Sequence, residues 1–132
     1  MWNEHITSPL LDGSKSQLES LGVANSNIIE LFVPGAFELP FGSQILFEKH
    51  LELDAVICLG CVIKGETPHF DYVCLGATQG IMNVGLKYNK PCIYGLITVN
   101  TLEQAQDRIG GNQGHKGIES AQTAIIQIIN NL

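Results

Sequence analysis

The sequence predicts one α/β domain of three layers, with helices on both faces of a parallel sheet. Strand-like apolar segments alternate with helix-like segments along the 132 residues, the order that is typical of a doubly wound parallel sheet. In addition, the segment 53–63 is almost entirely apolar, as expected for a strand that is covered on both faces. We therefore expect an αβα sandwich over residues 1–132.

The first half of the chain is predicted to hold two helices and a strand between them. Pro9 after Thr7 and Ser8 indicates a helix start, and Gly22 indicates its end. The segment "NIIELFV" (27–33) is predicted to be a strand, and "PGAFELP" leads into a helix that runs to about residue 50.

The second half continues the alternation. After the strand 53–63 we expect a helix over about 70–87 and a strand over 91–99. Thr101 is expected to cap a short helix that ends at about residue 109. A last helix carries a single apolar stripe, formed by Ile118, Ala121, Ile125 and Ile128.

The N-terminal region lacks a strand that a complete sheet of this class would have. A helix is predicted within ten residues of Met1 with no strand before it, and three strands are few for a sheet of this class, which has about five. Either another chain completes the sheet or an N-terminal strand is missing from this sequence. We favour the second explanation.

Composition narrows the class of partners. The net charge is −6, which argues against nucleic acid and acidic membrane surfaces. No stretch is long and apolar enough to span a membrane, and no signal-peptide pattern opens the chain. Only 15% of the residues are charged, so we expect part of the surface to be buried against other subunits.

Four cysteines lie in apolar segments, and Cys58 and Cys61 form a CxxC pattern. A spacing of three in a strand sends the two side chains to opposite faces. No second CxxC or pair of histidines completes a metal site. We expect buried, reduced thiols, no metal, and a cytoplasmic location.

The polar turn "KGETPHFD" follows the apolar strand 53–63, at the edge where parallel-sheet proteins bind ligands. His69 is the candidate for proton transfer, with a hydrogen bond at the helix N-terminus as the alternative. Asp71 suits the first helical turn. Thr67 can cap the helix or bind an anion, and Lys64 and Glu66 form either part of the site or a solvated pair.

Arg108, the only arginine, and Lys116 flank the glycine-rich segment "IGGNQGH". Two cations at a glycine-rich turn before a helix suit a phosphate group, although a flexible linker explains the glycines equally well. We expect His115 to be exposed or at an interface rather than catalytic. His5 and His50 are interpreted as surface residues.

Two further residues have alternative explanations. Glu38 either favours the start of its helix or bonds ligand hydroxyls. Trp2 either packs on the core or stacks on a flat ligand. From the residues alone, the sequence predicts an α/β enzyme without a cofactor that acts on a small phosphorylated substrate.

Four motifs, taken together and in order, resemble the lumazine synthase family: "WNEHITSPLLDG", "VPGAFELPFG", "GCVIKGETPHFDYV" and "TLEQAQDRIGGNQGHKGIESAQTAI". The resemblance implies a flavodoxin-like fold and a transferase of riboflavin biosynthesis. This enzyme condenses 5-amino-6-(D-ribitylamino)uracil with 3,4-dihydroxy-2-butanone 4-phosphate to 6,7-dimethyl-8-ribityllumazine, and releases phosphate and water without a cofactor. It also implies a homopentamer, twelve of which can form an icosahedral shell, and riboflavin synthase as a partner.

The resemblance also implies roles for residues, with His69 as the catalytic proton carrier. The pyrimidine and ribityl chain would be bound by Trp2, Asn3, Ala36, Phe37, Glu38, Cys61, Val62, Ile63 and Tyr94, with Tyr94 supplied by a neighbouring subunit. The phosphate would be bound by Gly65, Glu66, Thr67, Arg108 and Lys116, with Arg108 again from the neighbour.

The sequence departs from the family pattern at two places. The family has about two strands before the segment that reads "MWN" here, and "GNQGHKG" carries Asn112 and His115 where Lys and Asn are commoner. The linker length favours a shell of pentamers. The alternative function is a homologue that binds lumazine or flavin, or builds a shell, without catalysis.

Overall fold

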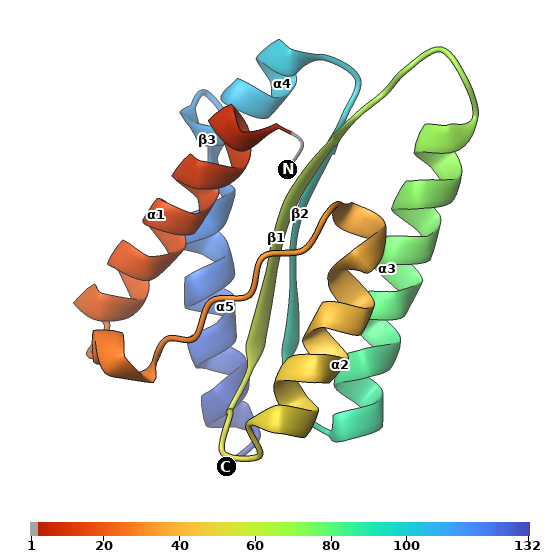
Figure 1. The fold of residues 1–132 in the computed structure, drawn as a ribbon. Helices are drawn as coiled ribbons and strands as arrows, with labels where there is room; N and C mark the ends of the chain where they lie inside the picture. Colours follow the sequence, from red (N-terminus) through yellow and green to blue (C-terminus); the bar gives the residue numbers. More distant parts are fainter. Residues whose placement is uncertain (1–2) are drawn as a thin grey trace.

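The computed structural model describes residues 3–132, which form a three-layer α/β sandwich (Figure 1). A parallel sheet lies between one layer that contains α1 and α5 and another that contains α2 and α3. The main elements are α1 (Glu4–Ser20), α2 (Leu39–Lys49), β1 (Val56–Ile63), α3 (His69–Tyr88), β2 (Cys92–Val99), α4 (Leu102–Gln106) and α5 (Lys116–Asn130). The predicted fold class is confirmed.

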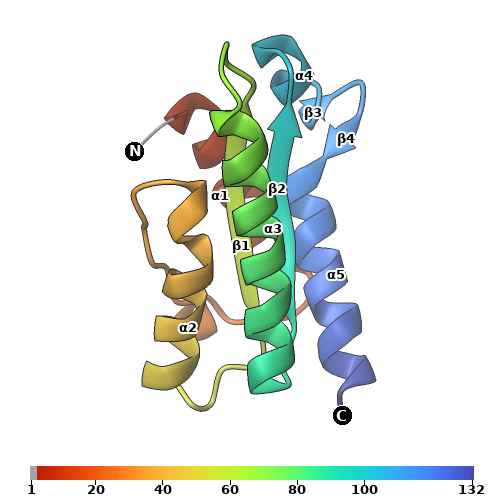
Figure 2. The ribbon, with the colours of Figure 1, turned by 90° about the vertical axis from the view of Figure 1, so that its right-hand side faces the viewer.

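The sheet consists of β1 and β2, which pair in parallel from Val56 opposite Cys92 to Ile63 opposite Val99. Both strands carry near-continuous apolar sequences because helices cover both of their faces (Figure 2). A small antiparallel hairpin, β3 (Ile109–Gly111) and β4 (Gly114–His115), precedes α5 and was not predicted.

Two apolar cores lie on opposite faces of the sheet. One contains Cys61 with Ile6 and Leu10 of α1, and the other contains Cys58 with Phe47 of α2. The prediction that Cys58 and Cys61 point to opposite faces is confirmed, and both thiols are buried.

The predicted strand at 27–33 is wrong. A 3-10 turn, η1 (Asn25–Asn27), opens this region, and residues 28–33 are extended without a strand ladder. A strand needs a neighbouring edge for its backbone groups, and no described segment pairs with this one. Leu31 and Phe32 are accordingly 44% and 61% exposed. The segment crosses in front of the sheet between α1 and α2 (Figure 1).

The start of the first helix is also corrected. α1 begins at Glu4, and Pro9 lies inside it rather than at its N-terminus. Ile6 and Leu10, four residues apart on one face, are fully buried, and this packing offsets the hydrogen bond that proline cannot donate. The predicted end at Gly22 is confirmed: its φ is 97°, and the N–H of Val23 closes the helix on the carbonyl of Leu18.

The other predicted elements agree with the structure within a few residues. A 3-10 turn, η2 (Ala36–Glu38), leads into α2, and the Thr101 hydroxyl caps α4 by accepting a hydrogen bond from the N–H of Gln104 at 3.2 Å. No helix in the range 3–132 is long and apolar enough to cross a membrane.

The expectation that His115 is exposed is not met within one copy, whereas a place at an interface stays a prediction. The residue is half-buried, and its Nδ1 caps α5 by accepting a hydrogen bond from the N–H of Ile118 at 3.3 Å. Its ring packs against Gly13 of α1, where a side chain would collide with it. His115 is therefore a structural cap at the contact between α1 and α5. His5 is exposed as expected, whereas His50 is partly buried.

Candidate active site at the carboxyl end of β1

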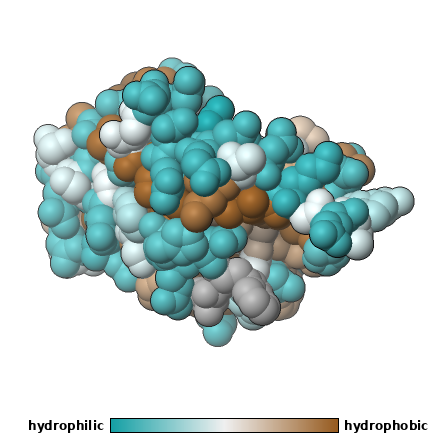
Figure 3. All heavy atoms as spheres, turned by 90° about the horizontal axis from the view of Figure 1, so that it is seen from above, coloured by the Kyte–Doolittle hydropathy of each residue, from teal (hydrophilic) through white to brown (hydrophobic). Residues whose placement is uncertain are grey.

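A cavity of about 1650 Å³ begins at the carboxyl end of β1 and continues along the strand towards its amino end. Its walls are β1, the extended segment 28–33, and parts of α1, α2, α3 and α5. Seen from the carboxyl ends of the strands, a hydrophobic band lies at the centre of the molecule and is framed by hydrophilic side chains (Figure 3).

The upper end of this cavity brings together a large part of the predicted site. The elements that supply these residues are the start of α1, η2, the end of β1 and the start of α3. The predicted residues that line the cavity are Asn3, Ala36, Phe37, Glu38, Cys61, Val62, Ile63 and His69. Trp2 lies outside the described residues.

Asn3 connects α1 to the end of β1. Its backbone is left-handed, with φ at 61°, a conformation that asparagine tolerates better than most residues. This conformation lets the backbone carbonyl start α1 while the side-chain Nδ2 donates a hydrogen bond to the Cys61 carbonyl at 3.1 Å. The amide of Asn3 is thereby held at the strand end.

The backbone of β1 presents alternate residues to the cavity. The N–H groups of Val56 and Lys64 bond to β2, so even-numbered residues face that strand, whereas Cys61 directs its carbonyl to Asn3 on the other side. Because backbone groups alternate along a strand, Ile63 directs its N–H and C=O towards the cavity. These two groups match the alternating donors and acceptors of a flat heterocycle.

The Cys61 side chain is buried in the core beneath α1. Burial raises the pKa of this thiol to about 11, because a thiolate would lose its hydration. Cys61 is thus an uncharged part of the wall.

His69 is the first residue of α3 and is exposed at the mouth of the cavity. Its side chain makes no hydrogen bond to any residue in the range 3–132, so the alternative role at the helix terminus falls to Thr67, whose hydroxyl accepts from the His69 N–H at 3.4 Å. Asp71 lies in the first turn of α3, as expected.

The two predicted phosphate-binding residues, Arg108 and Lys116, are joined through their backbones and lie outside the cavity walls. Arg108 donates from Nη1 to the carbonyl of Gln104 at 2.8 Å, and the N–H of Lys116 donates to the carbonyl of Arg108 at 2.8 Å. The turn residues Gly65, Glu66 and Thr67 are exposed and also lie outside the cavity walls.

Tyr94 does not join the site of its own copy. It lies on the face of β2 that α3 covers, and its hydroxyl accepts a hydrogen bond from Thr78 at 2.9 Å. One copy of the chain therefore holds one half of the predicted site in the cavity, and holds Tyr94, Arg108 and Lys116 elsewhere on its surface.

Sequence reasoning missed two wall residues on α3, Tyr72 and Val73. Their spacing of three and four from His69 places them on the same side of the helix, which is the signal that identifies them. Sequence reasoning also did not identify the contact that places Phe37 at the mouth of the cavity. The Phe37 ring packs directly over the α3 backbone at Gly76, where a Cβ would lie 2.7 Å from the ring.

The described residues contain no group of three His, Cys, Asp or Glu side chains placed to hold a metal ion. The polar groups of the cavity are instead backbone amides, an asparagine, a carboxylate and an imidazole. They suit a polar, uncharged organic ligand that needs positioning and a proton carrier.

This geometry places the chain among α/β proteins that bind small molecules beyond the carboxyl ends of parallel strands. The model of the 6,7-dimethyl-8-ribityllumazine synthase family matches residues 1–131, and the chain belongs to that family. Similar proteins named 6,7-dimethyl-8-ribityllumazine synthase include one from Parabacteroides distasonis, 55% identical over 94% of this chain and 77% of its own length. Another, from Bacteroides fragilis, is 53% identical over 96% of this chain and 88% of its own length. A more distant one, from Protochlamydia amoebophila, is 47% identical over 96% of this chain and 73% of its own length.

Proposed function

We propose that the chain is a transferase that condenses 5-amino-6-(D-ribitylamino)uracil with 3,4-dihydroxy-2-butanone 4-phosphate. The product is 6,7-dimethyl-8-ribityllumazine, formed in the penultimate step of riboflavin biosynthesis, and phosphate and water are released. The observation that carries the proposal is the upper end of the cavity, which gathers Asn3, Glu38, the end of β1 and His69 in a chain of this family.

The pyrimidinedione would bind at the end of β1. Its N–H and C=O groups complement the N–H and C=O of Ile63, with Val62 and Cys61 beside it in the wall. The Glu38 carboxylate and the backbone of Ala36 and Phe37 would accept and donate hydrogen bonds to the ribityl hydroxyls. Asn3, fixed by Cys61, would border the ring edge, with Trp2 as the stacking residue.

His69 would carry the protons of the condensation. The amine of the pyrimidine attacks the ketone carbonyl, water leaves to give an imine, and loss of a proton next to the imine expels the phosphate. Ring closure by the second nitrogen releases another water. An imidazole exchanges protons near neutral pH, and His69 stands exposed at the mouth, so it can exchange them with solvent. Holding two substrates together would supply most of the rate.

The phosphate would lie between Gly65, Glu66 and Thr67 of one copy and Arg108 and Lys116 of a neighbour. We propose this sharing because the two cations lie outside the cavity of their own copy. Large apolar side chains surround the cavity and need cover by another subunit. The exposed ones include Phe37 at 60%, Phe41 at 67% and Tyr72 at 72%.

The assembly would be a homopentamer, with twelve pentamers in a shell, and Tyr94 would belong to the neighbour's site. We place it in the cytoplasm, in keeping with its four free thiols. Riboflavin synthase, which consumes the lumazine, is the proposed partner.

The experiment is incubation of the purified chain with both substrates while the absorbance of the lumazine is followed, against the same mixture without protein. An enzyme gives many product molecules per chain and faster formation than the uncatalysed mixture. A protein that only binds lumazine shifts the absorbance of added lumazine but leaves the rate of formation unchanged, and that result would refute the proposal.

A further inference from the structure

We propose that Cys58, Cys92 and Ser43 form a binding site for one Cu⁺ ion, a soft and thiophilic metal ion. The site lies between the first halves of β1 and β2 and helix α2, on the face of the sheet that α2 and α3 cover. None of the three residues lines the cavity of the proposed active site, so this inference is independent of the catalytic proposal.

The two cysteines are held too far apart for a disulfide. In the register of the strands Cys92 lies opposite Val56 and Cys58 lies opposite Tyr94, so the two cysteines are diagonal neighbours on one face. A rise of about 3.3 Å per residue and a strand spacing of about 4.8 Å put the Cα atoms of such neighbours about 8 Å apart. A disulfide usually spans no more than about 6.8 Å between Cα atoms. The pair can therefore be joined by a bridging atom more readily than by a direct bond.

The distance between the two sulfur atoms fits a bridging metal ion. The Cys58 and Cys92 sulfur atoms are 3.9 Å apart. An ion at the usual metal–thiolate distance of about 2.3 Å from each sulfur atom would make a sulfur–metal–sulfur angle of about 116°. This angle is close to that of a trigonal ion with three ligands, so the ion needs no movement of the strands.

Ser43 supplies the third ligand atom. Its Oγ lies 3.0 Å from the Cys58 sulfur and donates its proton to the Leu39 carbonyl at 2.8 Å. Because the proton is used there, the lone pairs of this oxygen can accept from the Cys58 thiol or bind an ion. The hydrogen bond with Cys58 is also the chief cause that lowers the pKa of the Cys92 thiol, against the opposing effect of burial. Cys92 can thus give up its proton first to an incoming ion.

The ligand set favours Cu⁺ over other ions. Thiolates are soft ligands that select Cu⁺ and Zn²⁺ rather than Mg²⁺ or Ca²⁺. Structural Zn²⁺ sites have four ligands, but the buried side chains that cluster with Cys58 are apolar: Phe47, Val56, Ile81 and Val84. Two thiolates and one hydroxyl suit an ion of lower coordination number, which Cu⁺ accepts.

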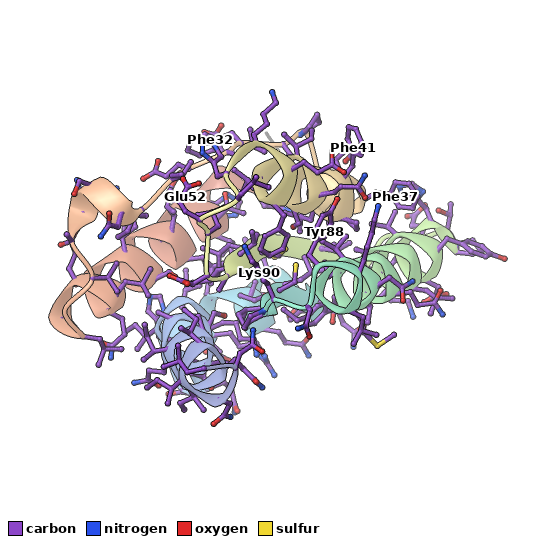
Figure 4. All side chains as sticks on the ribbon, turned by 90° about the horizontal axis from the view of Figure 1, so that it is seen from below. Phe32, Phe37, Phe41, Glu52, Tyr88 and Lys90 are labelled. Carbon is purple, nitrogen blue, oxygen red and sulfur yellow. The ribbon has the colours of Figure 1, made fainter. Side chains whose placement is uncertain are left out.

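Access and charge also agree with this site. Cys58 is 2% exposed, whereas Cys92 is half-buried, so an ion would enter past Cys92. Binding releases two protons, and two thiolates with Cu⁺ carry one negative charge. Lys90 places its ammonium 5.9 Å from the ring centroid of Phe47, which packs in the same cluster as Cys58. Seen from below, Lys90 and Tyr88 lie between α2 and α3 (Figure 4), where the cation offsets that charge.

The test measures Cu⁺ binding by the reduced 132-residue chain under anaerobic conditions. Bicinchoninate, a coloured Cu⁺ chelator, competes with the protein, and the loss of its colour reports the copper that the protein takes up. We expect one ion per chain, with two sulfur neighbours and one oxygen neighbour in X-ray absorption at the copper edge. Zn²⁺ is titrated in parallel against a zinc indicator, and we expect it to bind more weakly than Cu⁺.

Cysteine variants locate the ion. Cys58→Ser and Cys92→Ser each remove one thiolate, and we expect each to weaken Cu⁺ binding at least about 100-fold, more than the loss of a group outside the ligand set usually costs. Cys74→Ser removes a half-buried thiol of α3 that lies outside this cluster, and it should bind like the unmodified chain. If Cys58→Ser does not fold, Cys92→Ser at the half-buried position decides the outcome.

Serine variants test the third ligand. Ser43→Ala should weaken Cu⁺ binding about 10-fold or more. Ser120→Ala is the matched control, because Ser120 is equally buried in a helix and also donates to the carbonyl four residues before it. Equal effects of the two substitutions would contradict the role of Ser43.

Three further results would overturn the proposal. The first is unchanged Cu⁺ binding in both Cys58→Ser and Cys92→Ser. The second is an equal loss in Cys74→Ser, because any thiol would then take up the ion. The third is Zn²⁺ binding at least as tight as that of Cu⁺, because the site would then provide a fourth ligand.

Discussion

Asn3 donates its side-chain amide to the Cys61 carbonyl at 3.1 Å, which fixes the start of α1 to the end of β1 across 58 residues of sequence. This hydrogen bond occupies a backbone carbonyl at the ligand end of the cavity. It also holds a polar side chain where the pyrimidine is proposed to bind.

Replacement of Asn3 should therefore weaken both stability and substrate use. Asn3→Gly keeps the left-handed backbone and removes the amide, so we expect a loss of about 1 kcal/mol in the free energy of unfolding and a raised KM for the pyrimidine substrate. Asn25→Gly, at an exposed residue of η1, is the control. If KM changes equally in both variants, Asn3 does not border the ligand.

His69 should contribute a modest factor to the rate. His69→Ala is expected to lower kcat by about 100-fold or less, because a proton carrier assists a reaction that depends chiefly on positioning. His5→Ala, at an exposed residue of α1 outside the cavity, should leave kcat unchanged. A loss of several further orders of magnitude would contradict the positioning account, and no loss would remove His69 from the chemistry.

Arg108 should act on the phosphorylated substrate. Arg108→Ala is expected to raise the KM for 3,4-dihydroxy-2-butanone 4-phosphate by tenfold or more, about the effect of losing one charge-assisted contact, with little change in KM for the pyrimidine. Lys49→Ala, at an exposed lysine of α2, is the matched loss of one positive charge. An unchanged KM in Arg108→Ala would exclude the residue from the site.

The contact between α2 and α3 depends on the absence of a side chain at Gly80, where a Cβ would collide with the ring of Pro40. We expect Gly80→Ala to lower the free energy of unfolding by about 1–3 kcal/mol, the usual cost of overpacking. Gly65→Ala is the control for stability, because nothing lies within 4 Å of its Cβ position. Equal denaturant midpoints would show that the helices adjust freely.

The buried Cys61 thiol should make stability fall in alkali. Its pKa rises from 9.0 to about 11 on folding, so the unfolded chain ionises first and the free energy of unfolding decreases between about pH 9 and 11. Cys61→Ala removes this contribution, which we expect to be at most about 2 kcal/mol after allowance for screening. Urea unfolding at pH 8 and 10.5 measures the free energy of unfolding of both proteins, and the difference between them should be smaller at pH 10.5. A difference that stays constant would contradict this prediction.

The sequence predicts a helix or strand best where residues within that element are sufficient to determine it. The apolar run of β1, the stripe of α5, the Gly22 terminus and the Thr101 cap all follow from local rules. The segment 28–33 has an equally strong strand pattern, yet a strand also needs a partner edge, and no local signal reports whether one is present.

The site residues also divide into those that local sequence predicts and those that depend on tertiary packing. The ends of adjacent elements predict Glu38, Ile63 and His69 in one cavity, because chain topology alone brings strand ends together. The positions of Tyr94 and Arg108 outside it depend on the packing of β2 and of the β3–β4 hairpin. The roles of His115 and Gly76 depend on contacts between helices, which sequence spacing does not encode.

The most direct test of a site shared between copies uses His69→Ala and Arg108→Ala together. Each variant alone should form lumazine slowly at substrate concentrations below KM. When both are produced in one cell and assemble at random, about a quarter of the sites combine a native His69 with a native Arg108. We expect the activity per site to recover to about a quarter of that of the unmodified protein. An activity equal to the mean of the two variants would contradict it.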